Sequence, residues 1–131
     1  DFFYRGSSLP KDMIITSVKL KGSTKAKELI KKKQIELIER KKFSQPNQIK
    51  TCGSTFKNLS EKKKAWQLIK ETGSDKFKVG DAIISDKHCN FFVNNGNAKS
   101  SDIEELIKKV KKEVNTQLGV DLELEIKIIG E

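Results

Sequence analysis

Several residue types are scarce in this chain of 131 residues, and each scarcity narrows what the protein can do. Its two cysteines, Cys52 and Cys89, lie far apart and outside any closely spaced pair of the kind that binds zinc or exchanges disulfides. One histidine, His88, cannot supply a metal site alone. We therefore expect no bound metal, and two small buried thiols in a reducing compartment.

Long apolar runs are missing as well. No stretch approaches the roughly 18 apolar residues of a membrane span, and the first five residues lack both the basic start and the apolar run of a signal peptide. We therefore expect a soluble, cytoplasmic protein. Because the chain begins with Asp1 rather than methionine, we also expect it to be cut from a longer polypeptide.

Arginine is rare in an otherwise basic chain. The formal charge of +9 comes from 27 basic and 18 acidic residues, yet only Arg5 and Arg40 are arginines. Lysine matches base edges poorly, and the lysine runs are interleaved with glutamate, as on solvated helix faces. Most of this charge therefore indicates surface. Two alternatives stay open: a basic nucleic-acid-binding module that also uses exposed aromatics near the N-terminus, and a catalytically silent interaction domain.

Apolar spacing predicts a mixture of strands and helices without a repeated unit. We predict strands at 13–20, 77–85, 88–94 and 122–129, and helices at about 22–42, 60–72 and 101–118. The second helix would take Ser60 as its N-cap and bury Trp66, and the third would open with a capping box at 101–104 and end at Gly119. The predicted class is α+β, with a small, mostly antiparallel sheet and about three helices.

The octet at 51–58 surrounds one glycine with three different polar groups. Ser54 offers a hydroxyl, Lys57 a cation and Asn58 an amide beside Gly53. This combination suits chemistry or anion binding. The alternative is a plain turn at Gly53, whose backbone groups Ser54 and Asn58 satisfy.

Four stretches together resemble one family. They are Tyr4-Arg5-Gly6-Ser7, the octet, 86–91, and Leu122-Glu123-Leu124-Glu125 followed by Ile129-Gly130. In this order they resemble the C-terminal part of the UDP-N-acetylenolpyruvoylglucosamine reductases, also called UDP-N-acetylmuramate dehydrogenases, over essentially the whole chain. These enzymes reduce UDP-N-acetylglucosamine enolpyruvate to UDP-N-acetylmuramate for peptidoglycan synthesis, using FAD and NADPH.

The resemblance implies a role for each matching residue. Arg5 would bind the substrate carboxylate, Ser54 would protonate the carbanionic intermediate, and Glu125, rather than Glu123, would assist at the reacting double bond. A guanidinium can hold a carboxylate through two hydrogen bonds, and a serine can protonate a strongly basic carbanion when nearby donors stabilise the alkoxide. Further residues implied to contact or adjoin the substrate are Asn58, Lys57, His88 and Asn90.

The resemblance also implies a division of the chain. Residues 1–22 would be the tail of the FAD-binding domain, and 23–131 the substrate-binding domain. The family's glycine-rich FAD loop has no counterpart here, so we expect the chain to bind FAD and NADPH poorly without the N-terminal part of the same polypeptide. Among the departures from the family pattern, Leu59 stands where a proline usually follows the octet.

Overall fold

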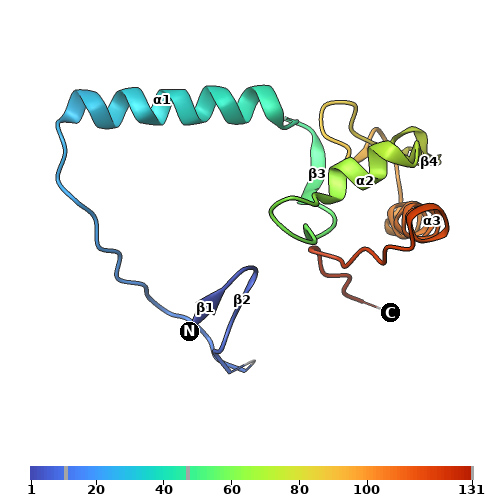
Figure 1. The fold of residues 1–131 in the computed structure, drawn as a ribbon, viewed down its shortest axis with the longest axis horizontal. Helices are drawn as coiled ribbons and strands as arrows, with labels where there is room; N and C mark the ends of the chain where they lie inside the picture. The colour runs from blue at the N-terminus through green and yellow to red at the C-terminus, as the bar shows by residue number, and fades with distance from the viewer. Residues whose placement is uncertain (11, 47, 131) are drawn as a thin grey trace. The chain divides into compact units, whose positions relative to one another are not determined.

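The computed structural model describes residues 1–10, 12–46 and 48–130, and its packing divides the chain into two compact units, 1–33 and 34–131 (Figure 1). The boundary lies inside helix α1 (Lys27–Ser44). The functional division at residue 22 is a different kind of boundary, which packing does not test, and it stays a prediction.

The first unit begins with a small hairpin. Strands β1 (Phe2–Phe3) and β2 (Gly6–Ser7) pair antiparallel, with Phe2 opposite Ser7. The predicted strand at 13–20 is wrong: its residues have no regular secondary structure and are exposed. A β-branched sequence needs a partner for its backbone hydrogen bonds, and no strand of the described residues pairs with this segment.

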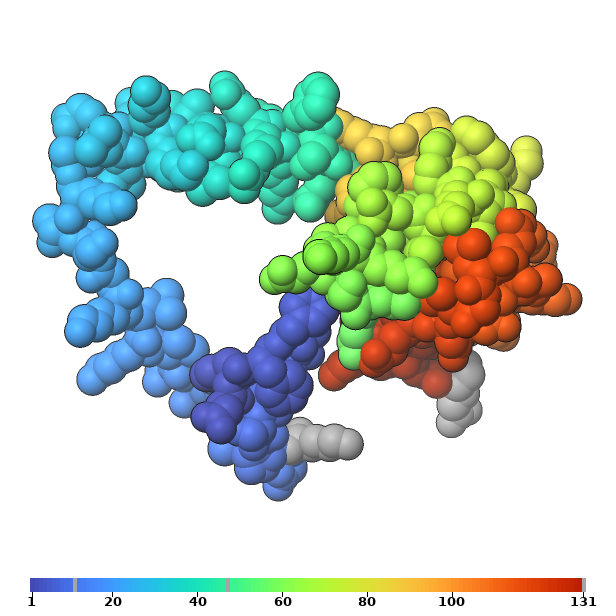
Figure 2. All heavy atoms as spheres, viewed as in Figure 1, coloured from blue at the N-terminus to red at the C-terminus, as the bar shows by residue number. Residues whose placement is uncertain are grey.

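Helix α1 confirms the first predicted helix, with a later start at Lys27 and an end at Ser44. None of its residues is buried, and apolar side chains such as Ile30 and Leu37 are exposed. In the space-filling view the chain between β2 and α1 is a thin run of atoms, whereas the green-to-red residues form a solid body (Figure 2).

The second unit contains a four-stranded antiparallel sheet in the order β3-β6-β5-β4. Its strands are β3 (Lys50–Ser54), β4 (Lys78–Val79), β5 (Ala82–Ile84) and β6 (Phe91–Asn94). The antiparallel sheet was predicted, but 77–85 is a hairpin rather than one strand. Its turn contains Gly80, whose φ of 52° interrupts the extended backbone.

Helix α2 (Ala65–Glu71) starts later than predicted, and the short 3-10 helix η1 (Ser74–Lys76) follows it. Ser60 is not its N-cap, since Lys64 occupies that position. The Ser60 hydroxyl instead accepts a hydrogen bond from the Lys63 amide, at 2.9 Å, in a turn before the helix. Trp66 is 43% exposed, so its predicted place in the core is also wrong.

Helix α3 (Ser100–Leu118) is the predicted third helix, and it ends at Gly119 with a φ of 64°. Its start differs in one detail. Lys99 is the N-cap, and its backbone N–H donates to the Asp102 carboxylate at 2.8 Å. The capping box is therefore formed by residues 99 and 102, two positions before the predicted one.

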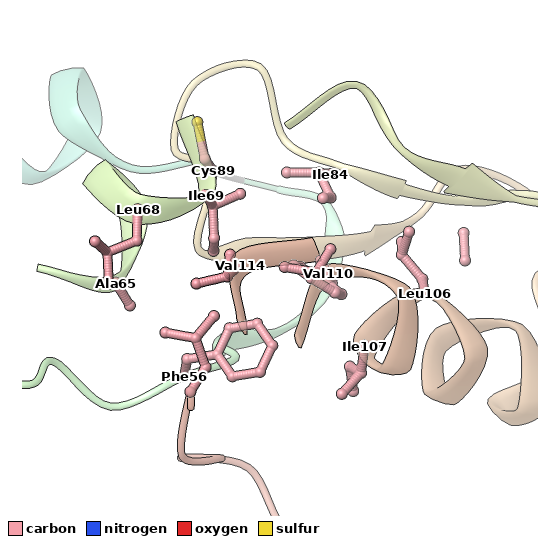
Figure 3. Close-up of a cluster of buried hydrophobic side chains, with 13 residues drawn as sticks. Phe56, Ala65, Leu68, Ile69, Ile84, Cys89, Leu106, Ile107, Val110 and Val114 are labelled. Carbon is pink, nitrogen blue, oxygen red and sulfur yellow. The ribbon is translucent and has the colours of Figure 1, made fainter. Parts of the chain in front are cut away.

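One hydrophobic core joins these helices to the sheet. Figure 3 shows Ile69 of α2 beside Val110 and Val114 of α3, with Phe56 on the same cluster. Burial of this apolar surface is the main source of stability for the second unit. The fully enclosed large side chains, each under 2% exposed, are Phe56, Ile69, Leu106, Leu122, Val110 and Val114.

The predicted final strand at 122–129 is wrong as a strand. Leu122 is buried, but a single antiparallel bridge between Phe56 and Leu124 is the only pairing within the described part of this segment, and Ile128 and Ile129 are exposed. The alternating pattern correctly placed Leu122 and Leu124 inward. It could not show that this segment borders the octet instead of joining the sheet.

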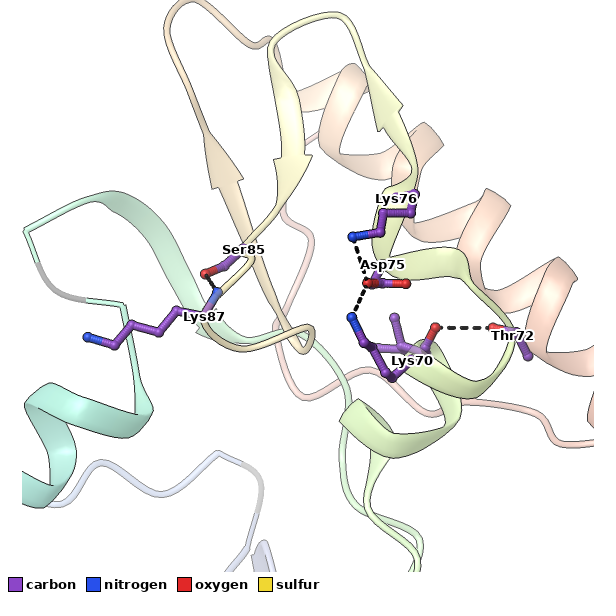
Figure 4. Close-up of polar contacts among 7 residues, drawn as sticks. Lys70, Thr72, Asp75, Lys76, Ser85 and Lys87 are labelled. Carbon is purple, nitrogen blue, oxygen red and sulfur yellow. Dashed lines mark hydrogen bonds and ion pairs between the residues drawn. The ribbon is translucent and has the colours of Figure 1, made fainter.

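A polar cluster lies between α2 and η1 (Figure 4). Asp75, whose side chain is 8% exposed, contacts Lys70 at 2.7 Å and Lys76 at 3.4 Å. The hydrogen bond from Lys70 holds the pKa of Asp75 below its ordinary value.

Among the described residues, no helix has the length and apolar character to cross a membrane.

Candidate functional site

A β-bulge positions the central part of the octet. Thr51 pairs with Val93 and Ser54 with Phe91, so β3 uses three steps where β6 uses two. The Thr51 hydroxyl donates to the Phe92 carbonyl at 2.7 Å and accepts from the Gly53 amide at 3.2 Å. Gly53 has a φ of 86°, a conformation that glycine adopts without strain. The bulge therefore leaves Ser54 half-buried as the last residue of β3.

Beyond Ser54, one asparagine side chain binds the octet backbone. The Asn90 amide accepts from the Phe56 N–H at 2.9 Å and donates to the Phe56 carbonyl at 2.8 Å. The backbone carbonyl of Asn90 also accepts a hydrogen bond from the backbone N–H of Thr55, at 2.8 Å. Asn90 is 3% exposed, so these hydrogen bonds lie in the interior.

The C-terminal segment lies along the other edge of the octet. The Glu125 amide donates to the Thr55 carbonyl at 2.9 Å, and the Lys57 amide donates to the Glu123 carbonyl at 2.8 Å. These bonds flank the Phe56–Leu124 bridge. Ser54 and Glu125 are far apart in sequence, but the Glu125 amide binds the carbonyl of the residue directly after Ser54.

The two glutamates of this segment have different surroundings. The carboxylate of Glu123 forms an ion pair with the Lys57 ammonium group, and its side chain is 73% exposed. Glu125 is half-buried. Partial burial and closeness to the Ser54 backbone distinguish Glu125 from Glu123.

His88 lies against aromatic rings. Its ring centroid is 4.9 Å from that of Phe91 and 6.4 Å from that of Trp66, both with edge-on geometry. Its Nδ1 accepts a hydrogen bond from the backbone N–H of Asn90 at 3.3 Å. Burial lowers the pKa of His88, which favours the neutral imidazole near pH 7.

The remaining predicted site residues have structural contacts of their own. The Asn58 side chain accepts a hydrogen bond from the Ala65 amide at 3.1 Å, which fixes the start of α2. Arg5 belongs to the first unit, in the turn between β1 and β2, with a φ of 57° and its guanidinium carbon 5.6 Å from the Tyr4 ring centroid. Its approach to Ser54 and Glu125 stays a prediction.

A pocket of about 420 Å³ lies against the octet, whose Thr51, Cys52 and Thr55 are among its lining residues. Thr51 and Phe92 from the sheet, Ile103 and Ile107 from α3, and Ile126 from the C-terminal segment contribute to its walls. Ser54, Lys57 and Glu125 are not among its lining residues, so we do not include it in the candidate site.

The glycines with positive φ that the structure describes, such as Gly53, Gly73 and Gly80, each stand alone in a turn or bulge, so they do not build a continuous cradle of backbone amides for a pyrophosphate. Within residues 1–10, 12–46 and 48–130, no three histidine, cysteine, aspartate or glutamate side chains gather as a metal site would require.

Sequence reasoning missed one residue that shapes the site, Thr51, and the structural role of another, Asn90. Thr51 fixes the bulge through its hydroxyl, and the Asn90 amide holds Phe56 across a separation of 34 residues. A threonine two residues before a glycine was a local signal for the first. No local pattern could reveal the second.

Comparison with known proteins identifies the family. The family model described as "UDP-N-acetylenolpyruvoylglucosamine reductase, C-terminal domain" matches residues 45–129. The reductase of Pelagibacter ubique (strain HTCC1062) is 46% identical over 130 residues, and that of Wolbachia pipientis wMel is 44% identical over 129. Each alignment covers 98% of this chain and 43% of the relative.

A solved structure agrees. The crystal structure of the UDP-N-acetylenolpyruvylglucosamine reductase of Thermus caldophilus superposes with a TM-score of 0.80 at 40% sequence identity, covering 96% of this chain and 44% of that one. These relatives support neither the nucleic-acid alternative nor a different fold class, and the α+β class is confirmed. The chain spans less than half the length of the relatives it matches, and it belongs to the UDP-N-acetylenolpyruvoylglucosamine reductase family.

Proposed function

We propose that this chain supplies the substrate-binding and proton-donating part of a cytoplasmic reductase that converts UDP-N-acetylglucosamine enolpyruvate to UDP-N-acetylmuramate. The observation that carries the proposal is the pairing of the octet with the C-terminal segment. It brings the backbones of Ser54 and Glu125 together, and both residues match positions of the family's motifs.

FAD would be held by the part of the polypeptide that corresponds to the rest of the relatives, and after reduction by NADPH it would supply the hydride. The residues of this chain act on the charge that reduction leaves. Arg5 binds the substrate carboxylate and stabilises the negative charge conjugated into it. The Ser54 hydroxyl then donates its proton to the carbanionic carbon, and nearby donors stabilise the alkoxide.

Glu125 fits a role beside the reacting double bond only in a protonated or proton-sharing form, because a bare carboxylate would oppose growing negative charge. Glu123 is a poorer candidate, since Lys57 neutralises its exposed carboxylate.

Positive charge on the chain suits a nucleotide-sugar substrate. The formal charge of +9 would favour approach of a diphosphate. Lys57, Asn58 and His88 lie on or beside the octet and its neighbouring turn, and we propose that they face the substrate. His88 would act there as a neutral hydrogen-bonding group rather than as a cation.

The test uses a full-length chimera in which this chain replaces the matching 43% of the Pelagibacter ubique reductase. We expect Ser54→Ala to leave flavin reduction by NADPH nearly intact and to slow flavin reoxidation by substrate by about 10²-fold or more. The control is Ser101→Ala, an exposed serine in α3. Equal losses in both half-reactions would contradict the proton-donor role of Ser54.

Binding measurements test the other parts of the proposal. The isolated chain should bind FAD weakly in a spectroscopic titration, because the glycine-rich FAD loop of the family has no counterpart in its sequence. Tight binding would contradict this expectation. A nonspecific DNA or RNA oligomer separates the reductase from the nucleic-acid alternative. Strong binding that falls steeply with salt would favour that alternative.

A further inference from the structure

We infer that Asn90 is a positioning residue for the proposed proton transfer: its buried side-chain amide fixes the Phe56 backbone, and through it the relation of Ser54 to Glu125. This inference rests on the proposed function. It replaces the expectation that Asn90 contacts the substrate.

The hydrogen bonds around Phe56 carry the inference. On one edge, the flanking residues Thr55 and Lys57 exchange backbone hydrogen bonds with Glu125 and Glu123. On the other edge, the Phe56 N–H and carbonyl both bind the Asn90 side chain, at 2.9 and 2.8 Å. The peptide groups around Phe56 are therefore held from both sides.

An amide is the side chain that this position requires. The β3–β6 ladder ends at the Ser54–Phe91 pair, so Phe56 has no strand partner on that side. A primary amide offers one acceptor and one donor in a single plane, as a peptide group does. Without it, the Phe56 N–H and carbonyl would be left unpaired in the interior, which is costly.

Burial argues against a substrate contact. Asn90 is 3% exposed, and its side-chain oxygen and nitrogen both bind Phe56. Its backbone carbonyl binds the Thr55 amide, directly after Ser54. The residue thus has three hydrogen bonds to the two positions that follow Ser54, and the carbonyl of one of these positions binds Glu125.

The test compares three variants in the chimera: Asn90→Ala, Asn90→Asp and the control Asn94→Asp. Asn94 lies at the other end of β6, and its side-chain amide similarly holds a turn, accepting from the Gly96 and Ala98 amides at 2.9 and 3.0 Å. The readouts are the two flavin half-reactions, the substrate dissociation constant, and a thermal melt to normalise for folded protein.

We expect Asn90→Ala to slow reoxidation at saturating substrate by about 10- to 100-fold, with flavin reduction and the substrate dissociation constant nearly unchanged, because small misplacements of reacting groups have effects of this size. The Asn94→Asp control should not slow reoxidation relative to flavin reduction. Asn90→Asp adds a test by pH, because only the protonated carboxyl can both accept from and donate to Phe56. Its reoxidation rate should recover relative to the unsubstituted chimera as the pH is lowered.

Two results would overturn the inference. A raised substrate dissociation constant with an unchanged saturating rate would make Asn90 a substrate contact, and unchanged half-reactions per folded molecule would leave it a role in stability only. Ser54→Ala measured alongside separates the two proposals. If it slows reoxidation while Asn90→Ala and Asn90→Asp do not, only the inference fails; if it has no effect, the proposed function fails.

Discussion

The two units of this chain differ in what supports their secondary structure. Residues 1–33 contain apolar side chains, but none of the described ones is buried. In residues 34–131, a sheet, two helices and the segment around Leu122 share one hydrophobic core. The same kinds of apolar pattern occur in both. The difference shows that a pattern becomes a packed element only where another element covers it.

The largest expected effect comes from removing a core ring in the second unit. Phe56→Ala should destabilise the chain by about 3–5 kcal/mol, because Phe56 is 1% exposed and its ring meets that of Phe92 edge-on at 5.8 Å. The matched change in the first unit, Ile14→Ala, should cost less than about 0.5 kcal/mol. Urea unfolding measures both values. Similar losses would show that the exposed segment is also packed.

A smaller effect is expected at the polar cluster beside the core. Asp75→Asn should cost about 1–3 kcal/mol, since it removes a charge-assisted hydrogen bond with Lys70. Because the folded-state pKa of Asp75 is lowered, its contribution is complete above the ordinary value near 3.8 and disappears as the pH falls through the folded value.

The control for Asp75 is Glu105→Gln, which breaks an exposed pair with Lys109 within α3 and should cost less than about 0.5 kcal/mol. Unfolding curves at pH 7 and below pH 4 measure both variants. An Asp75→Asn variant as stable as the parent protein at pH 7 would contradict the expected role of the cluster.

One glycine in each unit allows the backbone conformations of the two units to be compared without side-chain contacts. In both Gly53 and Gly22 an added methyl group would meet no atom within 4 Å, but only Gly53 has a positive φ, of 86°. Gly53→Ala should therefore cost about 1–2 kcal/mol through strain, whereas Gly22→Ala should be neutral or slightly stabilising. Thermal melts decide the matter; equal melting temperatures for the two variants would rule out the strain at the bulge.

The smallest expected effect is a pH dependence from His88. Since burial lowers its folded-state pKa, the unfolded chain binds a proton more readily as the pH falls below the ordinary value of 6.5. Stability should therefore decline with falling pH between 6.5 and the folded value, by at most about 1.4 kcal/mol for each pH unit. His88→Gln should flatten this slope in urea titrations, and an unchanged slope would assign it to another group.

Local signals allowed most helices to be predicted from the sequence, and non-local pairing explains the failures. Helix α3 has a continuous apolar stripe and a terminal glycine, so both its face and its end were predicted. The segments 13–20 and 122–129 have strand-like patterns, but a strand requires a partner that the sequence does not name. The predicted burial of Trp66 was wrong because the buried face of α2 is formed by Ala65, Leu68 and Ile69.

The candidate site shows the same limit. The motif around Ser54 and the glutamate at 125 could be found because family resemblance preserves their neighbours in sequence. The hydrogen bonds that bring them together could not, because they join residues 34 positions apart at Asn90 and link the octet to the C-terminal segment.

The bulge in β3 has a consequence for insertions and deletions. Pairing of Lys50 with Asn94 and of Thr51 with Val93 fixes the octet at one end, and the Phe56–Leu124 bridge fixes it at the other. The number of residues between these anchors is therefore set. Deleting Gly53 would leave two steps of β3 opposite two of β6, so the Thr51–Val93 and Ser54–Phe91 pairs would fit a regular ladder and the bulge would be lost. The bend that the bulge gives the chain just before Phe56 would be lost with it. This stretch should therefore tolerate changes of residue identity better than a change of length.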